Sequence, residues 1–170
     1  RTTDMSLLNS IASTLTSSLE LDEILNKTLG HVIRYLKVEA GEIFLLEEDK
    51  KTLRMVLHRG QAAEAFWTQN LFTVGKGYIG LVAEARVPVV SKDLKNDERF
   101  LRDAVVKAGF HQMVGIPLLS VDNLIGVMSV ATKKNDPIDE QSVQMMAAVG
   151  NWAGLAIENA RLHASARSAA

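Results

Sequence analysis

The sequence predicts a single α+β domain in which antiparallel β-hairpins combine with helices. Apolar residues recur at three- and four-residue steps near both ends of the chain, which is typical of amphipathic helices. Between them, two pairs of apolar, strand-like segments are each joined by a polar turn, as expected of hairpins. With 170 residues, 47% of them hydrophobic, the chain is long enough to bury one full core.

Two amphipathic helices are expected first. Residues 1–20 form one, and a second begins after Asp22, the expected N-cap. The apolar positions that define these two helices are Met5, Leu8, Ile11, Leu15 and Leu19 in the first, and Leu25, Leu29, Val32, Ile33 and Leu36 in the second.

A hairpin of residues 40–49 and 52–60 should follow, with Leu53, Met55 and Leu57 pointing inward. The acidic residues 47–49 lie on its turn beside two lysines. We interpret them as a solvated turn and not as an acid/base pair.

The segment "TVGKGYIGLV" contains glycines with the G-x-G-x-x-G spacing of dinucleotide-binding sites, at Gly75, Gly77 and Gly80. Such a site needs a preceding strand, a βαβ unit and an acidic residue about 20 positions on. Residues 62–72 are instead expected to be helical or irregular, and Asp93 follows Gly80 by only 13 positions. We therefore interpret the glycines as a tight loop that opens a short helix.

That helix runs from Gly77 to Arg86, and the strand 87–91 carries Pro88 near its start, which suits a sheet edge. A helix over residues 97–109, capped by Asp97 and closed by Gly109, comes next. Strands 110–119 and 124–134 form a second hairpin whose turn holds Asp122-Asn123. The last helix starts near Ile138, with Asp139 as its cap, and continues to about Arg167.

Composition excludes several functions. The net charge of −1 gives no basic surface for direct nucleic acid binding. No apolar run is long enough for membrane insertion, and we expect a cytoplasmic location. Because there is no cysteine, disulfides and thiolate metal sites are absent, and the four histidines lack metal-ligand spacing. Since no catalytic motif is present, we expect no enzyme, and the start at Arg1 suggests a fragment of a longer protein.

Three segments resemble the GAF domain family. They are "VGKGYIGLVAEARVPVVSKDL", similar to the family's glycine-rich helix and following strand, "GIPLLSVDNLIGVMSVATKK", similar to its last hairpin, and "VGNWAGLAIENARLH", similar to its terminal helix in bacterial sensor kinases and related regulators. The resemblance covers nearly the whole chain.

The resemblance implies one GAF domain over residues 1–170, with a PAS/profilin-like, six-stranded antiparallel sheet and helices on both faces. The helices of residues 1–20 and 139–168 are expected to pack together and to form a homodimer. The other sheet face is expected to hold a small-ligand pocket. The implied function is a sensory input domain of a sensor histidine kinase or related regulator of a two-component system; the alternative is a ligand-free dimerisation or protein-interaction module.

Family ligands can be weighed on the residues present. Bilin attachment and GAF-type methionine sulfoxide reduction both require cysteine, which is absent. Cyclic-nucleotide members carry an Asn-Lys pair and a downstream Phe, whereas here Asn135 precedes Asp136 and Ile138 takes the Phe position. Haem needs an axial ligand, and a lone strand histidine such as His111 is more often structural. The cofactor therefore stays unknown, with cyclic nucleotide and haem disfavoured.

The resemblance places the pocket between the glycine-rich helix and the strands 87–93 and 110–116. Free backbone N–H groups at the helix start, with polar side chains nearby, favour a small anionic or polar ligand. For Asp93 a loop-bracing role is an alternative, and for Phe72 and Met113 plain core packing. The candidate ligand-binding residues are Phe72, Gly77, Tyr78, Ile79, Ser91, Asp93, His111 and Met113.

The last helix carries a stripe of mostly small residues that we expect to contact a second copy of the chain. The alternative is that the stripe packs only on the chain's own sheet and first helix. The stripe consists of Val143, Met146, Ala147, Gly150, Ala153, Gly154, Ile157 and Ala160.

Overall fold

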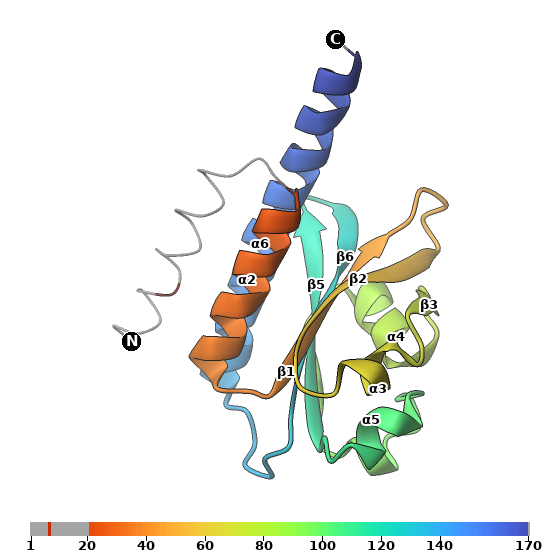
Figure 1. Cartoon of the computed structure of the whole chain (residues 1–170), viewed down its shortest axis with the longest axis vertical. Helices are drawn as coiled ribbons and strands as arrows, with labels where there is room; N and C mark the ends of the chain where they lie inside the picture. Colours follow the sequence, from red (N-terminus) through yellow and green to blue (C-terminus); the bar gives the residue numbers. More distant parts are fainter. Residues whose placement is uncertain (1–6, 8–20, 170) are drawn as a thin grey trace.

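A six-stranded antiparallel sheet forms the middle layer of the molecule, with α2 and α6 on one face and α3, α4 and α5 on the other (Figure 1). The computed structural model describes residue 7 and residues 21–169, with side chains up to residue 162. The expected helix over residues 1–20 lies outside the described residues, except for Leu7, which is buried against the core around α2 and α6. The predicted fold class is confirmed.

The strands follow the order β3-β2-β1-β6-β5-β4 across the sheet. Every pair of neighbouring strands is antiparallel, so the sheet contains no βαβ unit. Gly75, Gly77 and Gly80 are therefore not part of a dinucleotide-binding fold. One prediction was wrong: residues 62–72 were expected to be helical or irregular, but residues 71–73 form a strand. The strands are β1 Ala40–Leu46, β2 Thr52–Gly60, β3 Leu71–Thr73, β4 Val89–Ser91, β5 Gln112–Ser120 and β6 Asn123–Thr132.

The expected cap is confirmed for the last helix but not for α2, which begins at Leu21 or earlier and holds Asp22 in its first turn. The backbone N–H of Ser142 donates to Asp139 Oδ1 at 2.7 Å, which confirms Asp139 as the N-cap of the last helix. The helical elements are α2 Leu21–Leu36, α3 Ala63–Trp67, α4 Gly77–Ala85, the 3₁₀ turn η1 Leu94–Asn96, α5 Asp103–Lys107 and α6 Glu140–Ala169.

Two predicted elements need correction. The helix expected over residues 97–109 is only the five-residue α5, since the Asp97 carboxylate bonds Ser91 and Arg99 instead of capping a helix. The second hairpin turns at Val121 and Asp122, with Val121 at a φ of 54°, and Asn123 already pairs with Ser120 in the sheet.

The two sheet faces bury different cores. In β1, Ile43 and Leu45 face the long helices α2 and α6, whereas Ala40 and Phe44 face the short helices. The long-helix face is aliphatic apart from one partly buried tyrosine, and the short-helix face gathers five phenylalanines and Tyr78. We call these the long-helix face and the short-helix face.

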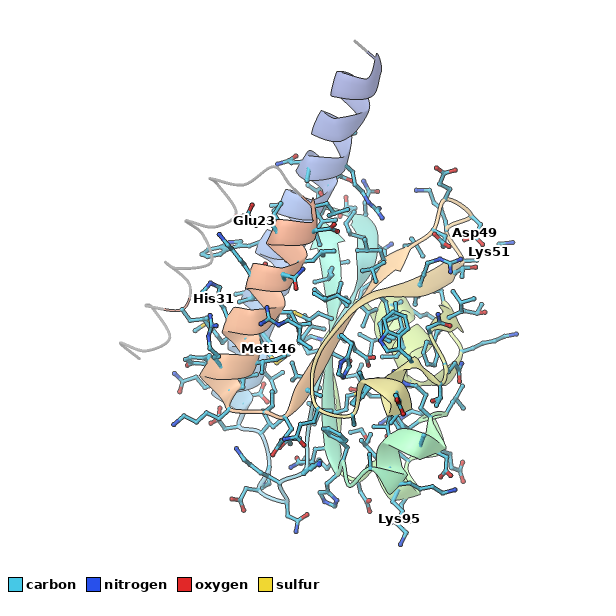
Figure 2. All side chains as sticks on the ribbon, viewed as in Figure 1. Glu23, His31, Asp49, Lys51, Lys95 and Met146 are labelled. Carbon is cyan, nitrogen blue, oxygen red and sulfur yellow. The ribbon has the colours of Figure 1, made fainter. Side chains whose placement is uncertain are left out.

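The small residues of α6 pack on the chain's own sheet. A Cβ at Gly150 would lie 2.6 Å from Ile116 Cγ2, and one at Gly154 would lie 2.1 Å from the carbonyl oxygen of Leu119. Met146 is 1% exposed at the same contact layer (Figure 2). The stripe therefore faces β5 and not a second copy, because only glycine allows the helix to approach the strand this closely.

None of the helices in the described part of the chain combines the length and apolar character needed to cross a membrane.

Candidate functional site

Glu42 lies in the middle of β1, and its side chain is completely buried on the short-helix face. In the sheet it stands opposite His58 of β2 on one side and Ser129 of β6 on the other. The Ser129 hydroxyl donates to Glu42 Oε2 at 2.7 Å. A buried carboxylate at the centre of a sheet requires a charged partner, since transfer of an isolated charge from water is unfavourable.

Arg102 is that partner. Its Nη1 and Nη2 donate to Glu42 Oε1 and Oε2 at 2.7 and 2.6 Å, and Nη1 also donates to the Phe66 carbonyl at 3.1 Å. The side chains of Arg102 and Glu42 are 1% and 0% exposed. This two-point, charge-assisted geometry is the strongest ion-pair arrangement that side chains form.

Aromatic rings surround the Arg102 guanidinium. Its carbon lies 5.2–5.7 Å from four phenyl ring centres, within the range of cation–π attraction. The rings come from four separate places in the chain, and we call the set the aromatic cage: Phe44 of β1, Phe66 of α3, Phe72 of β3 and Phe100 of the segment before α5.

Two buried nitrogen atoms at this centre have no hydrogen-bond partner within the described residues, Arg102 Nε and His58 Nε2. The His58 ring packs on Phe66, with ring centres 4.8 Å apart. Burial lowers the pKa of His58; the Glu42 carboxylate opposes this and Arg102 adds to it. The ring is therefore neutral at pH 7, and Glu42 and Arg102 remain the charged pair of the cage.

The predicted site residues divide between the core and the surface. Phe72 belongs to the aromatic cage, and Ile79 and Met113 are buried in the apolar core beside it. Gly77 has a φ of +70°, as its loop role requires. The Tyr78 hydroxyl donates to the backbone carbonyls of β4 and β5, at Val89 and, at 3.2 Å, Met113, and burial raises its pKa.

The remaining predicted residues are polar and lie near β4. Ser91 Oγ donates to Asp97 Oδ2 at 2.6 Å, and Asp93 Oδ2 accepts from Asn96 at 2.7 Å, which is the loop-bracing alternative. Ser91 and Asp93 line a wide, open groove of about 580 Å³. The structure does not bring them together with the aromatic cage, and the half-buried His111 lines neither region.

An ion pair stabilises the β4 groove. Arg99 donates to both carboxylate oxygens of Asp97, at 2.8 and 2.6 Å. These bonds, with that from Ser91, lower the pKa of Asp97 to about 2. The carboxylate is therefore ionised at every physiological pH and already fully bonded within the protein.

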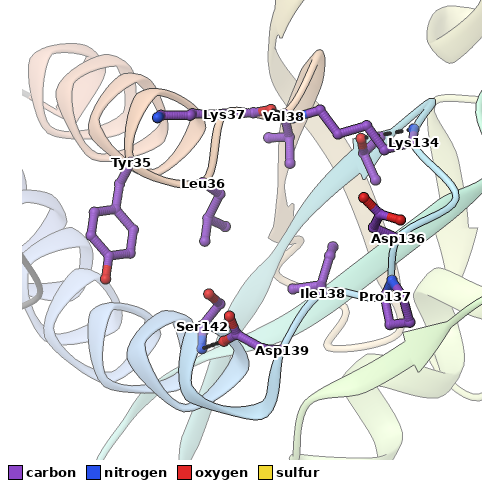
Figure 3. Close-up of a pocket in the computed structure, with 11 residues that line it drawn as sticks. Tyr35, Leu36, Lys37, Val38, Lys134, Asp136, Pro137, Ile138, Asp139 and Ser142 are labelled. Carbon is purple, nitrogen blue, oxygen red and sulfur yellow. Dashed lines mark hydrogen bonds between the residues drawn. The ribbon is translucent and has the colours of Figure 1, made fainter. Parts of the chain in front are cut away.

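A second groove, of about 410 Å³, lies on the long-helix side, between the end of α2 and the start of α6 (Figure 3). Lys134 Nζ donates to the Lys37 carbonyl at 2.6 Å, and Asp139 caps α6. Gln112 donates to the carbonyls of Lys134 and Asp136 at 2.8 and 2.7 Å. The groove's polar groups thus hold the connection from β6 to α6 in place.

The acidic turn behaves as expected. Asp49 and Lys51 project from the tip of the β1–β2 hairpin (Figure 2), and Asp49 Oδ1 accepts from the N–H groups of Lys51 and Thr52 at 2.9 Å each. These bonds lower the pKa of Asp49. Among the described residues, no three histidine, aspartate or glutamate side chains gather as metal ligands.

Glu42 and Arg102 were missed by the sequence interpretation. One signal was available: Glu42 stands between Gly41 and Ile43 in a strand that is otherwise apolar, where a charged residue needs a buried partner. No local signal identifies Arg102, which is 60 residues away in the chain and reads as the exposed side of a helix.

Comparison with known proteins agrees with this architecture. The model of the GAF domain family matches residues 18–158. The "Nif-specific regulatory protein" of Azospirillum lipoferum is 27% identical over 124 residues, which are 71% of this chain and 20% of that protein. The chain thus spans about a fifth of the length of that relative.

Solved structures show the same fold at low identity. The GAF domain of the Acinetobacter phosphoenolpyruvate-protein phosphotransferase has a TM-score of 0.80 at 20% identity, over 95% of this chain and 97% of that one. The free methionine-R-sulfoxide reductase of Neisseria meningitidis, solved with its substrate, also has a TM-score of 0.80, at 16% identity over 94% and 91% of the two chains. Regulatory and enzymatic proteins therefore share this fold.

Proposed function

Because the chain belongs to the GAF domain family, we propose that it is the sensory input domain of a bacterial regulatory protein. It binds a small ligand on the short-helix face of the sheet and passes the signal through α6 to an output domain. GAF domains are commonly regulatory, and the curated relatives are named as regulatory proteins. We further propose that the output belongs to a related regulator or a sensor kinase in the cytoplasm.

The observation that carries this proposal is the buried pair of Glu42 and Arg102. A buried ion pair adds little net stability compared with apolar residues of the same volume. An ion pair inside an aromatic cage does, however, supply the oriented polar groups of a binding site. The short helices α3 and α5, of five residues each, cover this face without the long packed elements of the other face.

Transmission through α6 is supported by its length. The helix runs for 30 residues, and Figure 1 shows its C-terminal turns extending past the end of the sheet. Its middle turns are fixed to β5 of the sheet through Gly150 and Gly154. A displacement of the sheet therefore reaches the end of the helix through one continuous hydrogen-bonded element.

We also infer that the domain is not an enzyme. The sequence has no cysteine, the residue that the resemblance to GAF-type methionine sulfoxide reductases requires. Both carboxylate oxygens of Glu42 and both terminal nitrogens of Arg102 take part in the hydrogen bonds between the two side chains. This arrangement suits recognition better than proton transfer.

The test is a thermal-shift screen of this chain against amines, guanidino compounds, amino acids, 2-oxo acids and nucleotides, followed by amide hydrogen exchange. A ligand of the folded state raises the melting temperature by mass action. We expect at least one compound both to raise it and to change exchange in residues 155–169. If every stabilising compound left exchange in that segment unaltered, the sensory proposal would fail.

A ligand-free dimerisation module is the second candidate, and one observation favours it. Trp152, Leu155 and Leu162 are 37%, 43% and 62% exposed on α6, at spacings that place them along one side of the helix. The homodimer that we propose uses this side. Sedimentation at high micromolar concentration should show a dimer for the natural chain and a monomer for Leu155→Glu, with the helix still folded; a natural chain that stays monomeric contradicts the dimer.

A further inference from the structure

We propose that the aromatic cage, together with Glu42 and Ser129, is a receptor for a guanidinium group that Arg102 fills in this structure. A small guanidino ligand binds there by displacing Arg102. The inference rests on the proposed sensory function, to which it adds the ligand class and the part of the chain that moves. It differs from the small anionic or polar ligand that we expected at the glycine-rich helix start.

The receptor and its occupant come from different parts of the fold. Glu42, Ser129, Phe44 and Phe72 all lie on strands, and Phe66 lies on α3. Arg102 comes from the irregular chain just before α5, together with the fourth ring, Phe100. The sheet and α3 can therefore keep the two polar groups and three of the four rings in place while the occupant leaves.

Residues 98–104 are attached to the sheet by their side chains. Within the described residues, residues 98–104 form no backbone hydrogen bond to any strand. Their backbone bonds are local, from Phe100 N–H to Asp97 and from Val105 N–H to Arg102. Leu101 is 52% exposed. Removal of the Arg102 side chain from Glu42 thus breaks the charged attachment of residues 98–104 to the sheet, while Phe100 keeps its contacts with Tyr78 and the core beside it.

The chemistry of the receptor selects a guanidinium. The two Glu42 oxygens bind two parallel N–H groups, which a planar guanidinium presents and a single ammonium does not. The ring faces attract a cation. An anion would meet the Glu42 carboxylate after Arg102 left, and a neutral ligand would leave that carboxylate buried without a charged partner.

The exchange preserves every charged contact. An incoming guanidinium takes over the bonds to Glu42 and the ring contacts, while the released Arg102 becomes hydrated. Arg102 competes with the ligand for the cage. The apparent affinity of the natural chain for the ligand therefore equals the intrinsic affinity multiplied by the fraction of molecules in which Arg102 has left the cage. If fewer than about one molecule in ten is open, removal of Arg102 should tighten binding at least about tenfold.

Arg102→Ala is the direct test, with ethylguanidinium as the probe. The variant keeps Glu42 and leaves the cage empty. At ten times its dissociation constant, ethylguanidinium should raise the melting temperature of this variant by about 3–6 °C. The natural chain should require at least about ten times more ethylguanidinium for the same shift.

Two controls separate specific binding from general stabilisation. Ethylurea has the same shape without the charge and should not raise the melting temperature of Arg102→Ala. Arg99→Ala removes the neighbouring exposed arginine, which pairs with Asp97 and not with Glu42, and should respond to ethylguanidinium only as the natural chain does. A cooperatively melting Arg102→Ala that ignores ethylguanidinium, or responds equally to ethylurea, overturns the inference.

The natural chain provides a second test if Arg102→Ala does not fold. In a ¹⁵N-labelled sample, the buried guanidinium of Arg102 should give slowly exchanging side-chain signals. Ethylguanidinium at tens of millimolar should shift them to the positions of exposed arginines. Signals that stay unchanged while Arg102→Ala remains unfolded with and without ethylguanidinium overturn the inference.

The outcomes distinguish this inference from the sensory proposal. If ethylguanidinium binds in the cage but no compound changes exchange in residues 155–169, the receptor stands and the sensory function fails. If another compound changes that exchange while Arg102→Ala ignores ethylguanidinium, the sensory function stands and the receptor fails.

Discussion

The two faces of the sheet are built in opposite ways. On the long-helix face, two regular helices of 16 and 30 residues pack on aliphatic side chains. On the short-helix face, five-residue helices and irregular chain surround aromatic rings and a buried ion pair. Continuous helices and apolar contacts favour stability, whereas a buried ion pair adds little to it. We call the long-helix face the scaffold face and, because the proposed ligand binds on the short-helix face, we call that one the response face.

The largest effect should come from a charge on the scaffold face. Gly150→Glu places a buried carboxylate where a Cβ alone would lie 2.6 Å from Ile116 and 2.9 Å from the Pro117 carbonyl. Overpacking and an unpaired buried charge together should lower the free energy of unfolding by more than about 5 kcal/mol. Circular dichroism and urea unfolding measure this, with the exposed Asn151→Glu as the matched control. A stable Gly150→Glu would place the stripe away from β5.

The ion pair of the response face should be next in size. Arg102→Met leaves Glu42 buried without a charge partner, and the free energy of unfolding should fall by about 3–5 kcal/mol. The double variant Glu42→Leu/Arg102→Met should recover most of that loss, because no charge remains buried. Urea unfolding of both variants decides the point. A double variant as unstable as the single one would mean that the pair stabilises the fold directly.

A smaller effect is expected where β4 and β5 meet α4. Tyr78→Phe removes the hydroxyl that donates to the Val89 and Met113 carbonyls, and should lower the free energy of unfolding by about 1–3 kcal/mol. Tyr35→Phe on α2 is the control and should stay within about 0.5 kcal/mol. Equal effects of the two variants would show that the Tyr78 hydroxyl has no structural role.

The smallest effect concerns pH. Burial lowers the pKa of His58 below its value of 6.5 in the unfolded chain, so at acidic pH the unfolded chain binds the proton more readily. Stability should therefore decrease as the pH falls below 6.5, towards the lowered pKa. His31, whose pKa burial also lowers, contributes with the same sign. Urea unfolding between pH 5 and 7.5 should show a shallower pH dependence for His58→Gln than for the natural chain; an unchanged slope contradicts this.

The scaffold face was largely predictable from the sequence, because its signals are local. The three- and four-residue spacing gave α2 and α6, and Asp139 gave the start of α6. Pro88 correctly indicated an edge strand, since β4 is the last strand of the sheet. The predicted contact partner of the small residues in α6 was wrong. Periodicity shows that one face of a helix is buried, but it does not show which element covers that face.

The response face was less predictable, because it depends on contacts between distant residues. Asp97 resembled a helix cap, but Ser91 and Arg99 compete for its carboxylate. The pair of Glu42 and Arg102 joins a strand to a loop. Glu42 is the one charged residue of an apolar strand, but nothing in the sequence identifies Arg102 as its partner. The resemblance led us to expect a ligand pocket on this face, and both the pocket and its binding residues remain a proposal.

The contact between Gly154 and the Leu119 carbonyl has a mechanical consequence. No side chain separates helix from strand at this point, so the two backbones cannot move closer and the contact acts as a fulcrum. The helix continues for about 22 Å beyond it at 1.5 Å per residue. If α6 tilts about this contact, a small movement of β5 becomes a larger movement at the C-terminal end of the helix, in proportion to the lengths of the two arms.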